Sequence, residues 1–460
     1  MLKKPQSKLL VNIEQHFAQY NSALQQAVKV FQDLDQLEYE LGLLDEEQTT
    51  ASQYSWWPIV GVMGGDGRDT AWLLEQLLDV TETDAQQSNY HPKFTVLQYH
   101  KDTTIALPGT ALDVDYRLPF YEISKRIERI APGEGHNINA YLELKSNGHE
   151  RLKNRLLIHA PPLTHTSLSD PITRLLTEHV LETADLVLIF CDIFKHDDVP
   201  IAQFCQAIAA QQDSDKFIFL VNETDASIEA IQQQLVSAGV RAGQFMVLHS
   251  QTPPTAETQT TLDSIARRVA QVGHYRSYRI LHYLEMHIDH LQNTIIPEVT
   301  DALSVWKERS HFSSLIVIGL LVTLILMIEI NIGGFLDLAL DPIIGPIILL
   351  VIIGIMIPTH LAFSRFHAKW LINRLEKRQK NLRMLENMAT LFEKHLSPMR
   401  MLLPVTTPLG WNQSAKRRVA KLLDKTHGLV LLLNDSFGVF TTPATPPDHT
   451  SRPDQHGQEQ

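Results

Sequence analysis

Residues 59–78, IVGVMGGDGRDTAWLLEQLL, contain the pattern that decides the fold of this chain. The first five are apolar enough for a buried strand, glycines follow at 64, 65 and 67, and apolar residues then recur at helical spacing. A glycine-rich turn between a strand and a helix is typical of α/β domains that hold a phosphate at the helix N-terminus. Three alternatives arise: a working nucleotide site, a degenerate one, or a turn that needs glycine for steric reasons.

Alternating strand and helix patterns continue to about residue 250. The expected strands are apolar runs rich in aliphatic and β-branched residues, at 58–63, 94–99, 140–144, 155–159, 186–190, 217–221 and 245–248. Amphipathic helices follow several of them. This alternation predicts an α/β domain at 56–251, with a mainly parallel sheet covered by helices on both faces.

Helical periodicity flanks this domain on both sides. One seam has steps of four and three residues, as in a coiled coil, and consists of Ile13, Phe17, Tyr20, Leu24, Ala27, Phe31 and Leu34. We predict one long bundle helix within 1–55, a helical stalk at 255–312 and a C-terminal bundle segment at 364–436, in which one apolar stripe continues from Leu371 to Leu396. Pro297 should kink or restart the stalk. The tail at 437–460, rich in Pro, Thr, His and Gln, is expected to be disordered.

An almost wholly apolar block occupies 313–363. Its two stretches, 315–330 and 343–363, are each long enough to cross ~30 Å of hydrocarbon. Lys and Arg flank the block on both sides but are absent from the loop between the stretches. The lengths of the two stretches predict a transmembrane hairpin, and the positive-inside rule predicts an inner (plasma) membrane with both termini in the cytoplasm. A pair of buried core helices is the alternative. Trp306 is expected at the headgroup level, and Glu329 would mark an ion path if several chains formed a channel.

Composition excludes several classes of protein. The net charge of −12 argues against nucleic acid as a partner, because such proteins cluster Lys and Arg. Two cysteines, Cys191 and Cys205, give no disulfide framework and suit a reduced compartment. The 21 histidines show no metal-site spacing, so no metal site is expected.

The glycine-rich turn departs from the phosphate loop G-x-x-x-x-G-K-[ST] at the residues that hold phosphate and metal. When Gly67 is aligned with the second glycine, Arg68 replaces the lysine and Asp69 replaces the hydroxyl, while Thr70 comes one residue late. An arginine fork does not replace an ammonium group without rearrangement. A carboxylate at position 69 would repel phosphate.

The segments downstream follow the order of GTPase motifs. RLLIHAPPL at 155–163 stands where a strand enters D-x-x-G, and ADLVLIFCDI at 184–193 stands where the next strand falls. KFIFLVNETD at 216–225 stands where a strand enters N-K-x-D, and FMVLHSQ at 245–251 stands at the last guanine-side loop. In this order the chain resembles the dynamin-like GTPases. As a whole it resembles their membrane-anchored bacterial members, in which a G domain is set into a helical bundle that meets the membrane.

This resemblance implies a set of nucleotide-binding residues. They are Gly64, Gly65, Asp66, Gly67, Arg68, Asp69, Thr70, Asn222 and Asp225, of which the last two would read the guanine base. His159 and Pro162 replace the aspartate and glycine of D-x-x-G, Glu223 replaces the lysine of N-K-x-D, and Thr103 or Thr104 would be the switch threonine. GTP is therefore the implied ligand. Mg²⁺ and hydrolysis are not expected, and no catalytic residue is assigned.

The sequence thus predicts an α/β P-loop GTPase-like domain, inserted in a long α-helical bundle that carries a two-helix transmembrane hairpin. The predicted function is that of a dynamin-like pseudo-GTPase anchored in the inner membrane. It would self-associate through its helical segments as a scaffold on the lipid bilayer, either biased by nucleotide or independent of it. One alternative is an active membrane GTPase with an unconventional P-loop. Another is an oligomeric channel or transport component regulated by the G-like domain.

Overall fold

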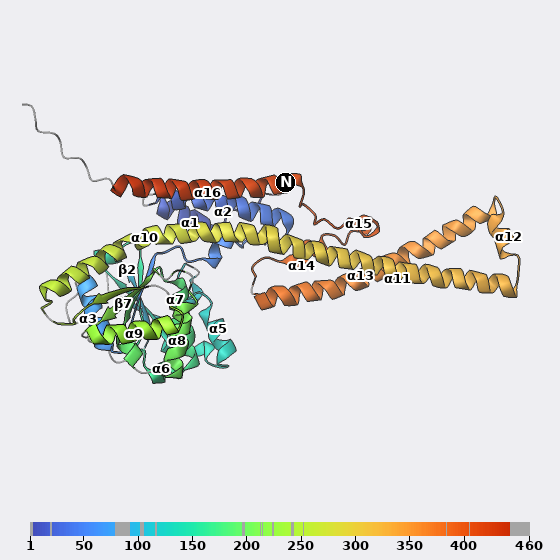
Figure 1. Cartoon of the computed structure of the whole chain (residues 1–460). Helices are drawn as coiled ribbons and strands as arrows, with labels where there is room; N and C mark the ends of the chain where they lie inside the picture. The colour runs from blue at the N-terminus through green and yellow to red at the C-terminus, as the bar shows by residue number, and fades with distance from the viewer. Residues whose placement is uncertain are drawn as a thin grey trace, which may run out of the picture. The chain divides into compact units, whose positions relative to one another are not determined.

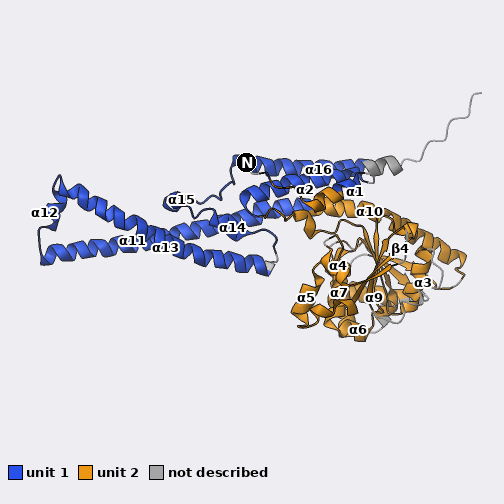
Figure 2. Cartoon of the chain, turned by 180° about the vertical axis from the view of Figure 1, so that it is seen from behind, with its two compact units in different colours: residues 1–3, 14–43, 284–460 blue, residues 4–13, 44–283 orange. Residues whose placement is uncertain are grey.

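The computed structural model describes residues 3–18, 21–78, 93–101, 105–115, 117–195, 198–211, 213, 215–222, 225–240, 243–251, 253–382, 384–403 and 405–441. The chain divides into two compact units, which Figure 2 shows in different colours. Unit 2 comprises residues 4–13 and 44–283, and unit 1 comprises residues 1–3, 14–43 and 284–460. Along the sequence, most of unit 2 is therefore inserted into unit 1.

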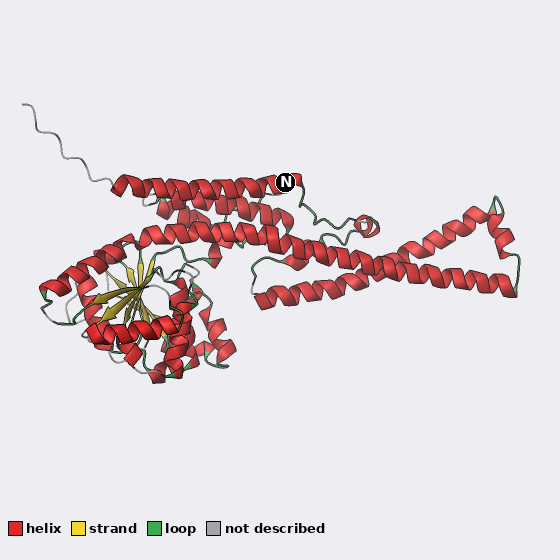
Figure 3. Ribbon diagram, viewed as in Figure 1, coloured by secondary structure: helices red, strands yellow, loops and turns green. Residues whose placement is uncertain are grey.

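Unit 2 contains an eight-stranded mixed sheet in the order β3-β4-β2-β5-β1-β6-β7-β8. Figure 3 shows its strands in yellow, among red helices. The strands are β1 (Ile59–Met63), β2 (Phe94–Tyr99), β3 (Ile105–Pro108), β4 (Leu142–Asn147), β5 (Leu156–His159), β6 (Leu186–Phe190), β7 (Phe217–Val221) and β8 (Gln244–Val247). Five of the seven strand pairings are parallel, and β2–β5 and β3–β4 are antiparallel. The prediction of a mainly parallel sheet is confirmed.

Two local predictions for the sheet need correction. β3 was not expected, because all four of its residues are exposed and lack the pattern of a buried strand. β4 begins at Leu142 instead of residue 140, because Gly135–Ala140 forms a 3₁₀ helix ahead of it.

Helices cover both faces of this sheet, as predicted (Figure 1). One apolar core lies between the sheet and α4 (Thr110–Val114), α5 (Ile123–Ile130), α6 (His165–Ser169), α7 (Pro171–Thr183), α8 (Val199–Ala209) and α9 (Asp225–Ser237). On the other face a second core packs against α3 (Gly67–Leu78) and the first part of α10 (Ala256–His290). Alternate residues of β1 enter the two cores, Ile59 the first and Val60 the second, which explains why this strand is apolar throughout.

Unit 1 is helical. The N-terminal helical segment, which begins in unit 2 and continues into unit 1, differs from the single helix expected. α1 (Lys8–Phe17) ends before α2 (Ser22–Leu41) begins. The side chain of Asn21 caps α2 by accepting a hydrogen bond from the Leu24 N–H, and this cap fixes a new helix start. The predicted seam is nevertheless buried at each of its described residues. α2 packs against α16 (Gln413–Thr441), and Arg418 pairs with Glu40 at 2.6 Å.

The prediction for Pro297 is confirmed. α10 leads through one π-helical turn, Leu291–Ile295, into α11 (Ile296–Asn331), where proline occupies the first turn. A proline has no N–H to donate, and its ring clashes with the carbonyl four residues earlier in a regular helix. The helix therefore widens into a π-helical turn just before Pro297.

The C-terminal segment differs from its prediction in two places. The stripe predicted to continue from Leu371 to Leu396 belongs to two helices, α13 (Ile344–Leu382) and α14 (Met388–Glu393). Asn387 interrupts it, because its side chain caps α14 at the Thr390 N–H. α15 (Pro398–Leu402) follows. α16 extends to Thr441, so the first residues of the predicted disordered tail are helical, and 442–460 lie outside the described residues.

Two helices are long and apolar enough to cross a membrane, with the spans inside Ala256–Asn331 and Ile344–Asn381. The short helix α12 (Phe335–Leu340) lies between them. None of the first span and only 11% of the second is buried, which argues against the alternative of buried core helices. Trp306, which was expected at the headgroup level, packs against other helices of the chain. This residue is fully buried, and its indole N–H donates to the Ser364 carbonyl at 2.8 Å.

Candidate functional site

The predicted motif segments meet at one edge of the sheet. β1, β5, β6, β7 and β8 are mutually parallel neighbours, so their carboxyl ends share an edge. The glycine turn follows β1, His159 ends β5 and Asn222 follows β7. The structure therefore brings the aligned GTPase motifs to the edge at which ligands of α/β sheets bind.

A carboxylate of the chain occupies the N–H groups of the glycine turn. Asp192, in the 3₁₀ turn after β6, accepts hydrogen bonds from the Gly65 N–H at 3.0 Å and from the Asp66 N–H at 2.5 Å. These N–H groups precede α3 and are of the kind that would surround a phosphate. Burial raises the pKa of Asp192, opposed by the same two hydrogen bonds, and the carboxylates of Asp69 and Asp66 raise it further.

The N–H group of Arg68 is also taken. Asp66 accepts a hydrogen bond from the Arg68 N–H at 2.9 Å and pairs with the Arg68 guanidinium at 3.1 Å. The Arg68 side chain is 87% exposed. The arginine that aligns with the phosphate-loop lysine is thus paired with an adjacent aspartate, and three N–H groups of the turn donate to carboxylates.

The glycines of the turn are required by close packing. A Cβ on Gly64 would lie 2.8 Å from Cβ of Phe190, and a Cβ on Gly65 would lie 2.9 Å from Asp192 Oδ2. Both distances are shorter than side chains allow. The end of β6 and the residues after it therefore explain both glycines without a phosphate.

His159, which aligns with the metal-binding aspartate, contacts Thr70, which lies one residue after the position of the metal-binding hydroxyl. The Thr70 hydroxyl donates to the Gly67 carbonyl at 3.1 Å, so the 3.0 Å contact with His159 has the imidazole Nε2–H as its donor. Burial lowers the pKa of His159 to about 4, with a contribution from Lys145, and the ring is neutral at pH 7. A neutral imidazole stands where a metal-binding aspartate would be expected.

The segment after β5 packs onto the turn. The Leu163 N–H donates to the Gly64 carbonyl at 2.8 Å, and the Pro162 ring lies 3.1 Å from where a Cβ on Gly67 would be. Pro162 itself has no N–H to offer to a ligand. This segment thus braces the turn.

The residues aligned with the base site are only partly described. Asn222 is exposed, and its side-chain carbonyl lies 3.2 Å from Nδ1 of His249, in the loop after β8. α9 begins at Asp225. Thr103, Thr104 and Glu223 lie outside the described residues. Asn222 and the glycine turn follow β7 and β1, which lie on opposite sides of β6 in the sheet.

No family model and no curated protein matches the chain. Two solved structures, reported under the description of an oligomerised bacterial dynamin pair that senses and tethers membranes at long range, are similar to it. The first has a TM-score of 0.32 and 12% identity, over 93% of this chain and 78% of the other. The second has a TM-score of 0.31 and 12% identity, over 94% and 74%.

The sequence analysis did not single out Asp192, the residue whose carboxylate accepts hydrogen bonds from the N–H groups of the glycine turn. Its signal was present, since it lies two residues after an apolar strand that was correctly predicted. Acidic residues after a parallel strand point toward the same edge as the glycine turn. Its partners lie more than 120 residues away, however, and follow only from the pairing of β1 with β6.

Proposed function

We propose that this chain is a membrane-anchored, dynamin-like scaffold whose G-like domain is degenerate. The observation that carries the proposal is the Asp192 carboxylate, which accepts hydrogen bonds from the N–H groups that a nucleotide phosphate would use. The strand order and the shared edge support the relation to a G domain. The occupation of the glycine turn by the Asp192 carboxylate supports the loss of nucleotide binding.

The electrostatics of the turn oppose a nucleotide. A β- or γ-phosphate would have to displace Asp192 and break two hydrogen bonds to a charged group, each worth about 1.5–3 kcal/mol. Together these cost about 3–6 kcal/mol, or roughly 10²- to 10⁴-fold in affinity. The carboxylates of Asp66 and Asp69 beside the turn add repulsion, and neither the lysine nor the metal-binding aspartate is present to offset it.

The exposed apolar helices supply the membrane anchor. We propose that α11 and α13 cross the plasma membrane as a hairpin, with the flanking Lys and Arg in the cytoplasm. Glu329 caps the hairpin turn, because its carboxylate accepts hydrogen bonds from the N–H groups of Phe335 at 2.8 Å and Leu336 at 3.0 Å. This contact favours a structural role for Glu329 over an ion path.

Self-association belongs to the proposal. Because the predicted seam around Phe31 and Leu34 is buried within the chain, assembly would use other surfaces of the helical segments. The proposal is tested with the full chain in lipid vesicles, by cross-linking for assembly and phosphate release for turnover. We expect assembly without nucleotide and no magnesium-dependent turnover.

The alternatives give different results in the same preparation. An active GTPase would hydrolyse GTP and lose this activity in Asn222→Ala. A channel would conduct ions and lose conductance in Glu329→Gln. Turnover above the protein-free rate would overturn the degenerate state, and a monomer in vesicles would overturn the scaffold.

A further inference from the structure

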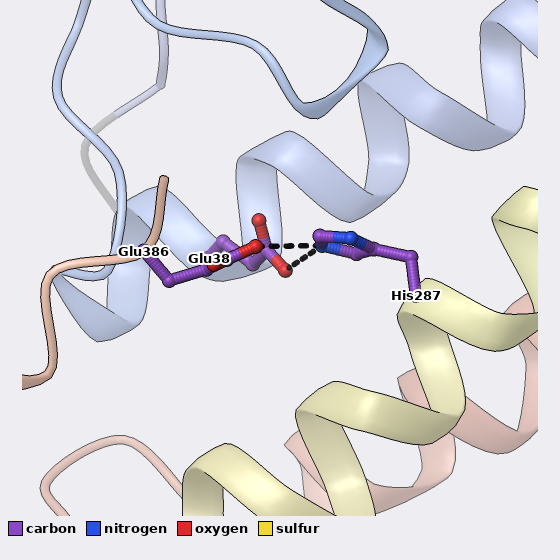
Figure 4. Close-up of side chains that lie close together, drawn as sticks. All are labelled: Glu38, His287 and Glu386. Atoms are coloured by element: carbon purple, nitrogen blue, oxygen red, sulfur yellow. Dashed lines mark hydrogen bonds and ion pairs between the residues drawn. The ribbon is translucent and has the colours of Figure 1, made fainter. Parts of the chain in front are cut away.

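Three side chains distant in sequence meet inside unit 1. They are Glu38 on α2, His287 on α10 and Glu386 in the loop between α13 and α14 (Figure 4). His287 Nε2 lies 2.9 Å from Glu38 Oε1 and 3.2 Å from Glu386 Oε1. The three atoms all lie within 4.8 Å of one another. They converge on one point between the three segments.

The three side chains are held in place and shielded from water. Their residues are 0%, 5% and 3% exposed, in the order Glu38, His287, Glu386. The loop that carries Glu386 is fixed by the Asn387 N–H, which donates to the Leu43 carbonyl at 2.7 Å just beyond α2. The Met388 N–H donates to the Gln379 side chain at 3.1 Å. These two bonds hold the backbone beside Glu386 in place.

The cluster has more negative charge than its one cation can satisfy. The Nε2 atom of His287 carries a single proton, which cannot serve both carboxylates fully. Within the described part of the chain, the second oxygen of Glu38 has no hydrogen-bond partner, although this residue is fully buried. Asp35, one turn earlier on α2, is also buried and adds a third carboxylate nearby. An unsatisfied buried carboxylate is costly unless a proton or a metal ion neutralises it.

We propose that Glu38, His287 and Glu386 bind a divalent transition-metal ion, with Zn²⁺ the best fit. An imidazole nitrogen with two carboxylate oxygens is a donor set that suits Zn²⁺ better than Mg²⁺ or Ca²⁺, which take oxygen ligands. Ligands at about 2.0–2.2 Å from a tetrahedral zinc lie about 3.3–3.6 Å apart, so the 2.9 and 3.2 Å contacts found here would each lengthen by a few tenths of an ångström when the ion binds. The ion would replace the Nε2 proton and neutralise the two carboxylates.

Such an ion would be structural. It would tie α2, α10 and the loop before α14 together by bonds that do not depend on the apolar seams. This role is separate from nucleotide, since all three ligands belong to unit 1 and the glycine turn belongs to unit 2.

The test uses the full chain in detergent, stripped with a chelator and titrated with Zn²⁺ alone by calorimetry. We expect one tight ion per chain and a rise in the melting temperature of unit 1. Co²⁺ bound in place of Zn²⁺ should give a visible absorption band, and this measurement needs only the wild-type chain. Glu386→Gln should weaken binding at least tenfold. If this variant does not fold, Glu386→Asp keeps the charge, moves the ligand and should also weaken binding.

The matched control is His427→Gln. His427 pairs with Glu285 at 2.9 Å, but both side chains are largely exposed. This variant should bind Zn²⁺ as the wild type does. The proposal is overturned if the wild type binds no Zn²⁺, or if Glu386→Gln and Glu386→Asp both retain its affinity, because binding would then reside at surface histidines.

Discussion

Replacement of Asp185 by asparagine should destabilise unit 2 strongly. This carboxylate is fully buried between the starts of β1 and β6. Its Oδ2 accepts hydrogen bonds from the Ile59 N–H at 2.9 Å and from Arg276 Nε at 2.9 Å. The Arg276 side chain is only 2% exposed, so Asp185→Asn leaves a buried guanidinium without its counter-charge.

The loss of folding stability depends on the hydrogen bonds that Arg276 retains in the variant. Removing one partner of a buried ion pair costs about 3–5 kcal/mol. Arg276 still donates to the carbonyls of Ser55 at 3.0 Å and Thr183 at 2.7 Å, so we expect the lower end, about 3 kcal/mol. Hydrogen exchange of the central strands through global opening should then be about 150-fold faster.

The assay is hydrogen exchange by mass spectrometry on the full chain, because peptides of β1 and β6 report on unit 2 alone. Asp213→Asn is the matched control. Asp213 lies 3.5 Å from Arg279 and is 53% exposed, so its loss should cost at most about 1 kcal/mol. Acceleration below about fivefold in Asp185→Asn would refute the reasoning, since the buried pair would then behave as a surface pair.

Three further predictions concern the turn, the buried cluster and the hairpin. Gly64→Ala should lower the urea stability by about 1–3 kcal/mol, because its Cβ would meet Phe190. Gly148→Ala, whose nearest neighbour would lie at 3.7 Å, should leave stability unchanged, and equal stability of the two variants would contradict this account. In the metal-free chain, unit 1 should lose stability as pH rises from about 5 to about 9. The folded pKa values of Glu38, about 7, and His287, about 9, lie above their ordinary values, so the folded state binds more protons, and the stabilisation disappears as pH passes through them. Asp35 and Glu386 also face this pair, and melting curves that are flat with pH, or unchanged in His287→Gln, would contradict the assignment. Finally, Asp337→Cys should react with an impermeant maleimide from outside the cell and Lys369→Cys only after permeabilisation, whereas the reverse pattern would contradict the proposed orientation; both native cysteines are buried.

The strands were predictable where burial imposes a continuous apolar run. β1, β6 and β7 are buried at every residue, and the sequence placed all three. β3 was not predicted, because all four of its residues are exposed. Its pairing with β4 therefore leaves no hydrophobic pattern in the sequence. Local chemistry also predicted the disturbance at Pro297, which needs only the missing N–H of one residue.

Features that depend on contacts between distant segments were not predictable. The break between α13 and α14 depends on Asn387, whose N–H binds the carbonyl of Leu43 on a different part of the chain. The cluster of Glu38, His287 and Glu386 joins residues up to several hundred positions apart and therefore has no spacing to detect. Asp192 belongs to the same class, since only the parallel pairing of β1 and β6 brings it to the glycine turn.

The central claim, that the chain's own carboxylate fills the phosphate position, is tested most directly by nucleotide binding. The full chain in detergent is titrated with labelled GTP and ATP, with and without Mg²⁺, beside Asp192→Ala and Asp225→Ala. We expect no binding by the wild type at millimolar nucleotide. Only Asp192→Ala should gain affinity, because it releases the N–H groups of Gly65 and Asp66. Micromolar GTP binding by the wild type that is lost in Asp225→Ala would show a working nucleotide site and overturn the claim.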